Sequence, residues 1–423
     1  MSQKIFLSFL GTNTYIPCNY QYKNGPKVKE VEFVQTALTS LFCNAFTAKD
    51  KAVIFITQQA KEKNWNRLQA EFEAKHLKSP LTAIEIPEGH LEDELWTIFQ
   101  IVYEQIEQDA HVILDVTHAF RSIPMMGIVL MNYAKFLKNI TVDGIYYGAF
   151  EALGRPAKVK EMPMEQRNAP VFELTAFDQL QQWSAAADNF VSGGNPRKIA
   201  QLLRDWISAS ERKNKKSRGQ DSVSVKTLEL ADNLDALYNQ LSTVRGKEIV
   251  SGKTFLNTEK GIEWLTPKLP IPPLKPLLEK MKKQLTGFKK NSPANGLKAT
   301  RLCLNFGLIQ QGITLLQESI VTSIAFKRQE LNYNLFEHRK IIRDAILKKG
   351  NPDFITKNPN LSDKLLKIAE DIPETTQIAP VYRKLSTARN NINHAEFSTN
   401  RTAIDFQKEL RESLFTAENI LGN

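Results

Sequence analysis

The chain has 423 residues, about three times the length of a typical ~150-residue domain, which predicts two or three domains and excludes a mini-protein scaffold. Its composition, 42% hydrophobic and 24% charged, is that of a globular protein, and no apolar run reaches the ~20 residues of a membrane span. The three scattered cysteines fit neither a disulfide framework nor a thiolate metal site, and without a signal peptide we expect a cytoplasmic protein.

Basic residues are concentrated in the second part of the chain. The net charge is +10, but residues 1–150 hold 14 basic and 16 acidic residues, which leaves 42 against 30, or +12, for the remainder. Lysine and arginine steer polyanions and release counterions from phosphates, so this excess favours a nucleic-acid partner. Many basic proteins bind no nucleic acid, and a solvated basic surface remains the alternative.

The first part of the chain alternates short apolar runs with helical patterns. This alternation is typical of a Rossmann-like parallel sheet flanked by helices, which we expect over residues 1–175. Its apolar residues are spaced three and four apart between the strands, as in crossover helices. Strands are predicted at 4–10, 52–57, 82–87, 111–116 and 142–147.

After about residue 172 the sequence predicts helices almost exclusively, so residues 176–423 are expected to form an all-α domain. An insertion is expected at about 246–295, with a hairpin in its glycine- and proline-rich part, residues 246–276. Amphipathic helices are predicted at 176–191, 196–212, 222–244, 296–327, 332–348, 376–394 and 401–421.

Two polar segments follow predicted strands of the sheet. Ligands of open parallel sheets bind at the carboxyl ends of the strands, where helix N-termini present backbone N–H groups. The sequence therefore predicts an anion-binding pocket built from both segments. The segments are Gly11-Thr12-Asn13-Thr14-Tyr15 and Asp115-Val116-Thr117-His118-Ala119-Phe120-Arg121-Ser122.

These segments also have a structural interpretation. Asp115 and Thr117 can bind turn amides, Ser122 can cap a helix, and His118 can simply be packed. Neither G-x-G-x-x-G nor the P-loop pattern occurs, so the pocket has no hallmark of a dinucleotide enzyme or an NTPase.

A second group of polar residues lies near the end of the last but one predicted helix. Asn390 and His394 are four residues apart and share a helix face, whereas Arg389 lies about 140° round from His394. Metal-free RNA cleavage needs a group that moves the 2′-OH proton and a cation that stabilises the phosphorane-like transition state. Histidine and arginine can supply both, but an exposed polar helix end is the alternative.

Other catalytic chemistries have little support in the sequence. The six histidines show no H-E-x-x-H or similar ligand spacing, and G-x-S-x-G is absent. We therefore predict no metal site and no serine nucleophile.

Together and in this order, the two groups make the sequence resemble the CRISPR-associated CARF–HEPN ribonucleases of type III systems. Residues 115–122 resemble the family's D-x-T-H-G-x-R-S signature, with Ala119 in place of the usual glycine. Arg389 and His394 match the R-x4-H motif of the HEPN superfamily, including a polar residue after the arginine. Residues 213–295 match no motif of the family.

The resemblance implies a cyclic-oligoadenylate-activated endoribonuclease of antiviral defence. It implies a homodimer or higher oligomer in which a CARF dimer binds the activator, with cyclic tetra-adenylate favoured over hexa-adenylate. A composite HEPN site would then cut single-stranded RNA without metal or cofactor, leaving a 2′,3′-cyclic phosphate. Carried onto this chain, the catalytic residues are Arg389, Asn390 and His394, and the ligand-binding residues are Gly11, Thr12, Asn13, Thr14, Thr117, His118, Ala119, Phe120 and Arg121.

The alternative from another class is a non-catalytic nucleotide sensor whose helical domain binds a partner or nucleic acid. A further alternative is that the N-terminal pocket degrades its own activator, as a ring nuclease. The sequence distinguishes neither from the first interpretation.

Overall fold

The computed structural model describes residues 2–75, 80–118, 122–207, 223–269, 271–351, 363–395, 397 and 400–422. The chain divides into two compact units, residues 1–179 and residues 180–423. The predicted domain boundary after residue 175 falls at the start of α7 (Thr175–Gly193), the helix that continues from the first unit into the second. Each unit is described by itself.

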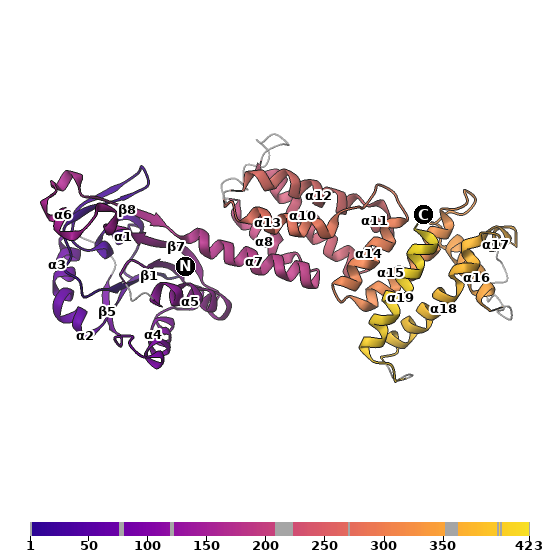
Figure 1. Ribbon diagram of the computed structural model, residues 1–423, viewed down its shortest axis with the longest axis horizontal. Helices are drawn as coiled ribbons and strands as arrows, with labels where there is room; N and C mark the ends of the chain where they lie inside the picture. Colours follow the sequence, from indigo (N-terminus) through magenta and orange to yellow (C-terminus); the bar gives the residue numbers. More distant parts are fainter. Residues whose placement is uncertain are drawn as a thin grey trace. The chain divides into compact units, whose positions relative to one another are not determined.

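The first unit is built around one eight-stranded sheet (Figure 1). The strand order is β3-β2-β8-β7-β6-β1-β4-β5, and the run from β7 to β5 is parallel. The predicted fold class, a Rossmann-like sheet followed by a helical region, is confirmed. The strands are β1 (Lys4–Leu10), β2 (Cys18–Tyr22), β3 (Lys27–Val31), β4 (Lys51–Ile56), β5 (Leu81–Glu85), β6 (His111–Asp115), β7 (Thr141–Gly148) and β8 (Asn168–Glu173).

Helices cover both faces of the sheet, because alternate residues of a central strand point to opposite faces. In β1, Phe6 and Leu10 belong to one buried cluster, whereas Ile5 and Phe9 belong to the other. The first cluster includes residues of α1 (Val34–Phe42) and α3 (Asn66–Ala74), and the second residues of α4 (Glu92–Glu104) and α5 (Ser122–Lys138). The shorter helical segments are α2 (Gln58–Ala60), a wide, π-helical turn (Lys61–Trp65), two short 3-10 helices (Phe150–Leu153 and Met164–Gln166) and α6 (Pro156–Glu161).

Three strands were not predicted from the sequence. Strand β2 pairs with β8 and β3, and β3 is a mostly exposed edge strand with lysines at Lys27 and Lys29. In β8, Pro170 breaks the usual composition of a strand. Short polar strands at the edge of a sheet have no apolar alternation from which they could be recognised.

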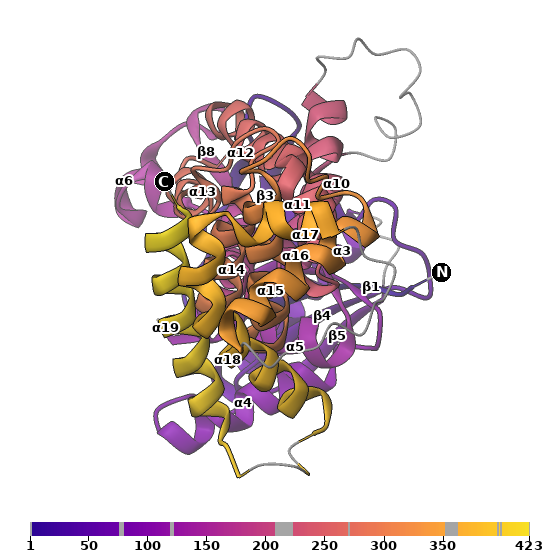
Figure 2. The same cartoon turned by 90° about the vertical axis from the view of Figure 1, so that its right-hand side faces the viewer.

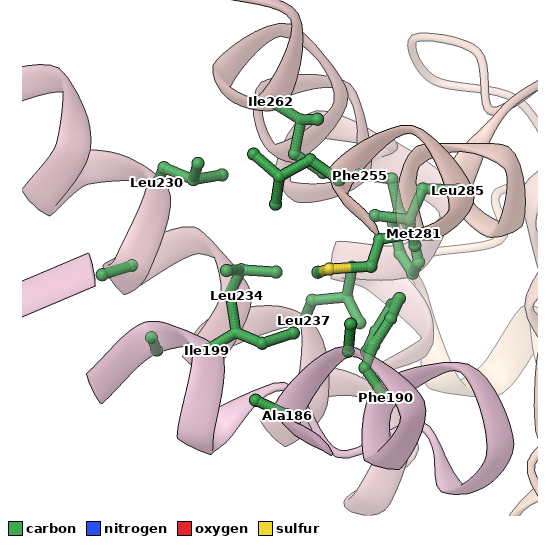
Figure 3. Packing of buried hydrophobic residues seen from close by; sticks show 14 of the residues in the cluster. Ala186, Phe190, Ile199, Leu230, Leu234, Leu237, Phe255, Ile262, Met281 and Leu285 are labelled. Atoms are coloured by element: carbon green, nitrogen blue, oxygen red, sulfur yellow. The ribbon is translucent and has the colours of Figure 1, made fainter. Parts of the chain in front are cut away.

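The second unit is entirely helical in its described residues, with two hydrophobic clusters that share α14 and α15. Figure 3 shows the first cluster, where Phe190, Leu234, Phe255 and Met281 come from four helices. The remaining helices are α8 (Arg197–Trp206), α10 (Val223–Ser242), α11 (Gly246–Ser251), α12 (Lys253–Leu265), a 3-10 turn (Thr266–Lys268), α13 (Leu274–Leu285), α14 (Ala294–Asn305), α15 (Ile309–Ala325), α16 (Phe336–Gly350), α17 (Asp363–Glu370), α18 (Pro373–Asn393) and α19 (Ala403–Leu421).

The hairpin predicted within residues 246–276 is wrong. That segment forms α11, α12 and the start of α13, and its apolar residues are part of the first helical cluster. Gly252 and Pro273 mark helix ends instead: Gly252 has φ +69 between α11 and α12, and Pro273 precedes α13, whereas Gly261 lies inside α12. The helix predicted over 296–327 is likewise two helices, which Gly307 separates with φ +71.

The second helical cluster holds α18 in place. Helices α15, α16 and α19 all pack on α18, and Figures 1 and 2 both show α19 beside it. Residues Ile378, Tyr382 and Leu385 form the buried face of α18. Within the described parts of the chain, no helix combines the length and the apolar character needed to cross a membrane.

We expect Phe255→Ala to lower the free energy of unfolding of the helical unit by about 3–5 kcal/mol. The ring is fully buried and stacks on Phe288 at 3.8 Å between centroids, so its removal leaves a cavity. Denaturant unfolding followed by circular dichroism measures the change. Phe415→Ala is the control, since this ring is 64% exposed on α19 and should cost less than about 0.5 kcal/mol. Equal losses for the two variants would contradict the assignment of the core.

Candidate functional site

The order of the sheet creates a cleft at the carboxyl ends of β1 and β6. After β2, β3 and α1 the chain returns to pair β4 with one side of β1, whereas β6 pairs with the other side of β1 and is followed by β7. The crossovers from β1 to β4 and from β6 to β7 therefore run to opposite sides of the sheet, and the point between β1 and β6 is the topological switch point where open sheets bind ligands. A cleft of about 280 Å³ lies there.

The cleft joins the two polar segments that the sequence places in one pocket. Its lining residues are Phe9, Leu10, Gly11, Thr12, Asn13, Phe55, Thr57, Ile86, Thr117 and His118. Of the predicted ligand-binding residues, Thr14 is exposed and does not line the cleft. Ala119, Phe120 and Arg121 lie outside the described residues.

Two side chains of the segment Lys61–Trp65 and the hydroxyl of Tyr15, within the loop itself, hold the loop after β1. The buried Asn64 donates from Nδ2 to the carbonyl oxygens of Gly11 (2.9 Å) and Asn13 (3.0 Å). Lys63 Nζ donates to the carbonyl of Thr12 at 2.6 Å, and the backbone N–H of Gly11 donates to the hydroxyl of Tyr15 at 2.9 Å. These contacts fix the loop backbone from one side and leave Thr12 and Asn13 exposed beside the cleft.

Asp115 and Thr117 brace the turn after β6. The buried Asp115 carboxylate accepts from Ser8 Oγ at 2.6 Å, from the N–H of Thr117 at 2.9 Å and from its hydroxyl at 2.5 Å. The Thr117 hydroxyl in turn accepts from the N–H of Gly148 at 2.8 Å. Burial raises the pKa of Asp115 above its usual value, in spite of these donors. The alternative that Asp115 and Thr117 stabilise the turn therefore holds for both side chains, and Thr117 in addition lines the cleft.

The imidazole of His118 is held in a mostly apolar environment at the cleft. Its ring meets the ring of Tyr15 edge-on, at 4.7 Å between centroids and 87° between planes. Its Nε2 is buried, and none of the residues that the structure describes gives that nitrogen a hydrogen bond. Burial lowers the pKa of His118 to about 4, so the ring is neutral at pH 7.

The predicted catalytic residues lie together at the C-terminal end of α18. Asn390 is exposed in the last full turn, and His394 is the exposed C-cap, whose N–H donates to the carbonyl of Asn390 at 2.9 Å. The side chain of Arg389 is 37% exposed. The end of α18 thus presents a guanidinium, an amide and an imidazole within about one turn.

Arg389 is also bound to the neighbouring helix α15. Its Nη1 donates to Oε1 of Gln317 at 2.8 Å, and it lies 4.0 Å from a carboxylate oxygen of Glu318. Glu318 is bound more closely by Arg339 of α16, at 2.6 Å. The guanidinium is therefore restrained from one side and accessible from the other.

Sequence reasoning missed several residues of both sites. Thr57 and Ile86 follow β4 and β5, so the rule of strand ends could have identified them. Gln317 is a polar residue at helical spacing between Ile313 and Ile320 on a buried helix face, and this pattern could have identified it as a buried polar side chain. Asn64 lies in a polar stretch of sequence and gives no such signal.

Comparison with known proteins gives one informative similarity. No family model matches the sequence. The chain is 24% identical over 341 residues to a protein named CRISPR-associated protein MJ1674 from Methanocaldococcus jannaschii, an alignment that covers 78% of this chain. It spans 44% of the length of that relative. The name agrees with the CRISPR association that the two motifs predict, and it states no activity.

We expect the first unit to lose stability as the pH falls from about 6.5 to about 4. Within that window an unfolded chain binds a proton at His118 that the folded chain excludes, so the free energy of unfolding falls with the pH. Denaturant unfolding at pH 7, 6, 5 and 4 measures the slope, and His118→Phe should flatten it relative to the unaltered chain. An NMR titration of His118 with a midpoint near 6.5 would contradict this account.

Proposed function

We propose that this chain is a CRISPR-associated, ligand-controlled endoribonuclease. A cyclic oligoadenylate binds at the β1–β6 cleft, and single-stranded RNA is cut at the end of α18 without a metal ion. One observation carries the proposal: Arg389, Asn390 and His394 are all accessible to solvent at that helix end. The name of the relative supports the CRISPR-related role, and the R-x4-H spacing supports the chemistry.

The chemistry follows from the side chains present. The 2′-OH of a ribose attacks the adjacent phosphorus, the bond to the 5′-oxygen breaks, and a 2′,3′-cyclic phosphate and a free 5′-OH result. His394 moves the proton of the 2′-OH or of the leaving oxygen, and Arg389 stabilises the negative charge on the phosphorane. Asn390 donates to a phosphate oxygen or orients the imidazole. The basic excess of the second part of the chain favours RNA binding.

The cleft supports the sensing half of the proposal. It is lined by the loop of Gly11, Thr12 and Asn13, by Thr117 and His118 after β6, and by apolar residues that include Phe9. A volume of about 280 Å³ lies just below the ~300–1,000 Å³ of small-molecule sites, so a nucleotide ring needs more than one such cleft. Two copies related by a two-fold axis would supply it, with cyclic tetra-adenylate as the favoured activator.

An exposed apolar face on α4 and α5 supports the homodimer. The face continues through the aromatic contacts of Phe99 with Trp96 and Tyr133. Contiguous apolar surface of this kind is typical of an interaction site, and a second copy is the occupant that the proposed two-fold site requires. The exposed members are Leu91, Trp96, Met125, Val129, Tyr133, Phe136 and Leu137.

The decisive experiment is cleavage of a labelled single-stranded RNA in EDTA, with and without cyclic tri-, tetra- and hexa-adenylate. We expect activator-dependent fragments that end in a 2′,3′-cyclic phosphate. His394→Ala and Arg389→Ala should each lower the rate by at least roughly 100-fold, because proton transfer and charge stabilisation contribute that much or more. Activator binding, measured by calorimetry, should be unchanged in both variants.

Two outcomes would contradict the proposal. Cleavage by His394→Ala at the rate of the unaltered chain would exclude the α18 site. Activator binding without cleavage by the unaltered chain would favour the alternative of a non-catalytic sensor. Consumption of the activator in the same reactions would instead identify the cleft as a ring-nuclease site.

We expect Phe136→Glu to weaken the dimer at least roughly tenfold, because a carboxylate would be buried at an apolar contact. The Phe136 side chain is 87% exposed on α5, so the substitution should not alter the folded subunit. Sedimentation velocity over a concentration series measures the dissociation constant. Phe172→Glu, at a half-exposed ring on β8, is the control. An unchanged constant for Phe136→Glu would exclude this face as the interface.

A further inference from the structure

Gln317 of α15 is buried and accepts a hydrogen bond from the proposed catalytic arginine. Helices α15 and α18 pack side by side (Figures 1 and 2). The Gln317 side chain is only 4% exposed and accepts from Nη1 of Arg389 through Oε1 at 2.8 Å. A buried amide that makes its hydrogen bonds on both ends is a rigid support for the group that it binds.

The orientation of this amide follows from its second partner. Nε2 of Gln317 donates to Oγ of Ser386 at 2.6 Å, and Ser386 Oγ donates its own proton to the carbonyl of Tyr382 at 2.9 Å. Since the serine proton is used in that bond, the serine oxygen can only accept from Gln317. The amide must therefore turn its NH2 group to Ser386 and its oxygen to Arg389.

The acceptor is neutral, which matters for the arginine that it holds. A carboxylate at hydrogen-bond distance would pair with the guanidinium and compete with the phosphate for its charge. The nearest carboxylate oxygen, on Glu318, is 4.0 Å away, and Arg339 binds that carboxylate at 2.6 Å. Arg389 is thus fixed in place while its positive charge stays available on the accessible side.

We infer that Gln317 is a positioning residue for RNA cleavage, which orients Arg389 through the relay from Tyr382 and Ser386. The effect of Gln317 on RNA cleavage rests on the proposed function, whereas its positioning of Arg389 does not. A guanidinium that acts on the transition state must be held in a fixed place, and a displacement of about 1 Å can cost roughly 100-fold in rate. Gln317 does this from α15, without touching the substrate.

The test compares Gln317→Leu with Gln310→Leu. Gln310 is the matched control, because it also joins α15 to α18, through Asn393 at 3.4 Å, without contacting Arg389. Gln317→Leu should lower kcat roughly 10- to 100-fold with KM for RNA within about twofold, since the arginine acts in the transition state. Gln310→Leu should change neither constant.

A second variant covers failure of the first to fold. Ser386→Ala removes the group that orients the amide, and it should lower kcat in the same direction by a smaller factor. A kcat within about threefold of the unaltered chain for Gln317→Leu, or for Ser386→Ala if Gln317→Leu does not fold, overturns the inference. An equal loss in Gln310→Leu also overturns it, because the effect would then come from helix packing.

A crystal structure of Gln317→Leu separates this inference from the proposed function. We expect the guanidinium of Arg389 to leave its place beside α15, and a guanidinium that stays in place overturns the inference. If the unaltered chain cuts no RNA but Arg389 is displaced in the variant, the proposed function fails and the positioning of Arg389 by Gln317 stands.

Discussion

The parallel pairing of β1 with both β4 and β6 is the constraint on which the first unit depends. Because β1 is central, its side chains are buried on both faces, and only its end is available to a ligand. The crossovers that follow β1 and β6 run to opposite sides of the sheet, which leaves a cleft at the carboxyl ends of these strands. The core and the ligand site adjoin there, since Phe9, Leu10 and Phe55 belong to the buried clusters and also line the cleft.

The second unit meets a different requirement, which is to hold polar groups at the end of a helix without burying them. α18 is anchored by the buried face of Ile378, Tyr382 and Leu385, and its C-terminal turn extends beyond this anchor. Exposed side chains at a helix end are ordinarily mobile. The amide of Gln317 restores order for one of them, because a buried and doubly bonded acceptor lies within its reach.

Much of the architecture could be predicted from the sequence, and the failures have physical causes. Strands β1, β4 and β6 are apolar and largely buried, so the sequence pattern predicted them, whereas the edge strand β3 and its neighbour β2 carry polar residues that resemble a loop. In the segment that begins at Gly246, glycine and proline were interpreted as breaking structure. Gly252 and Pro273 only separate helices there, because the residues of those helices, such as Phe255 and Leu278, are buried at helical spacing.

The sites could be predicted less completely than the fold. Motif spacing placed His118 and His394 at the correct ends of their elements. It could not show that the Thr117 hydroxyl accepts from the N–H of Gly148, because hydrogen bonds between residues far apart in the sequence depend on strand register. Supporting residues such as Asn64 and Gln317 act through partners 51 to 72 positions away, so no local pattern reveals them.

The wide turn Lys61–Trp65 between α2 and α3 has a consequence for the way this ligand site can vary. A turn of this kind accommodates one surplus residue in a helix, and removing a residue would rotate the following helix by about 100° relative to the preceding one. Asn64 could then face the Gly11 loop only if Leu68 turned away from the sheet. Deletion of one residue in this turn would therefore cost either the hydrogen bonds of Asn64 to the Gly11 loop or the packing of Leu68 in the core. Substitutions on the outer side of the turn would preserve both.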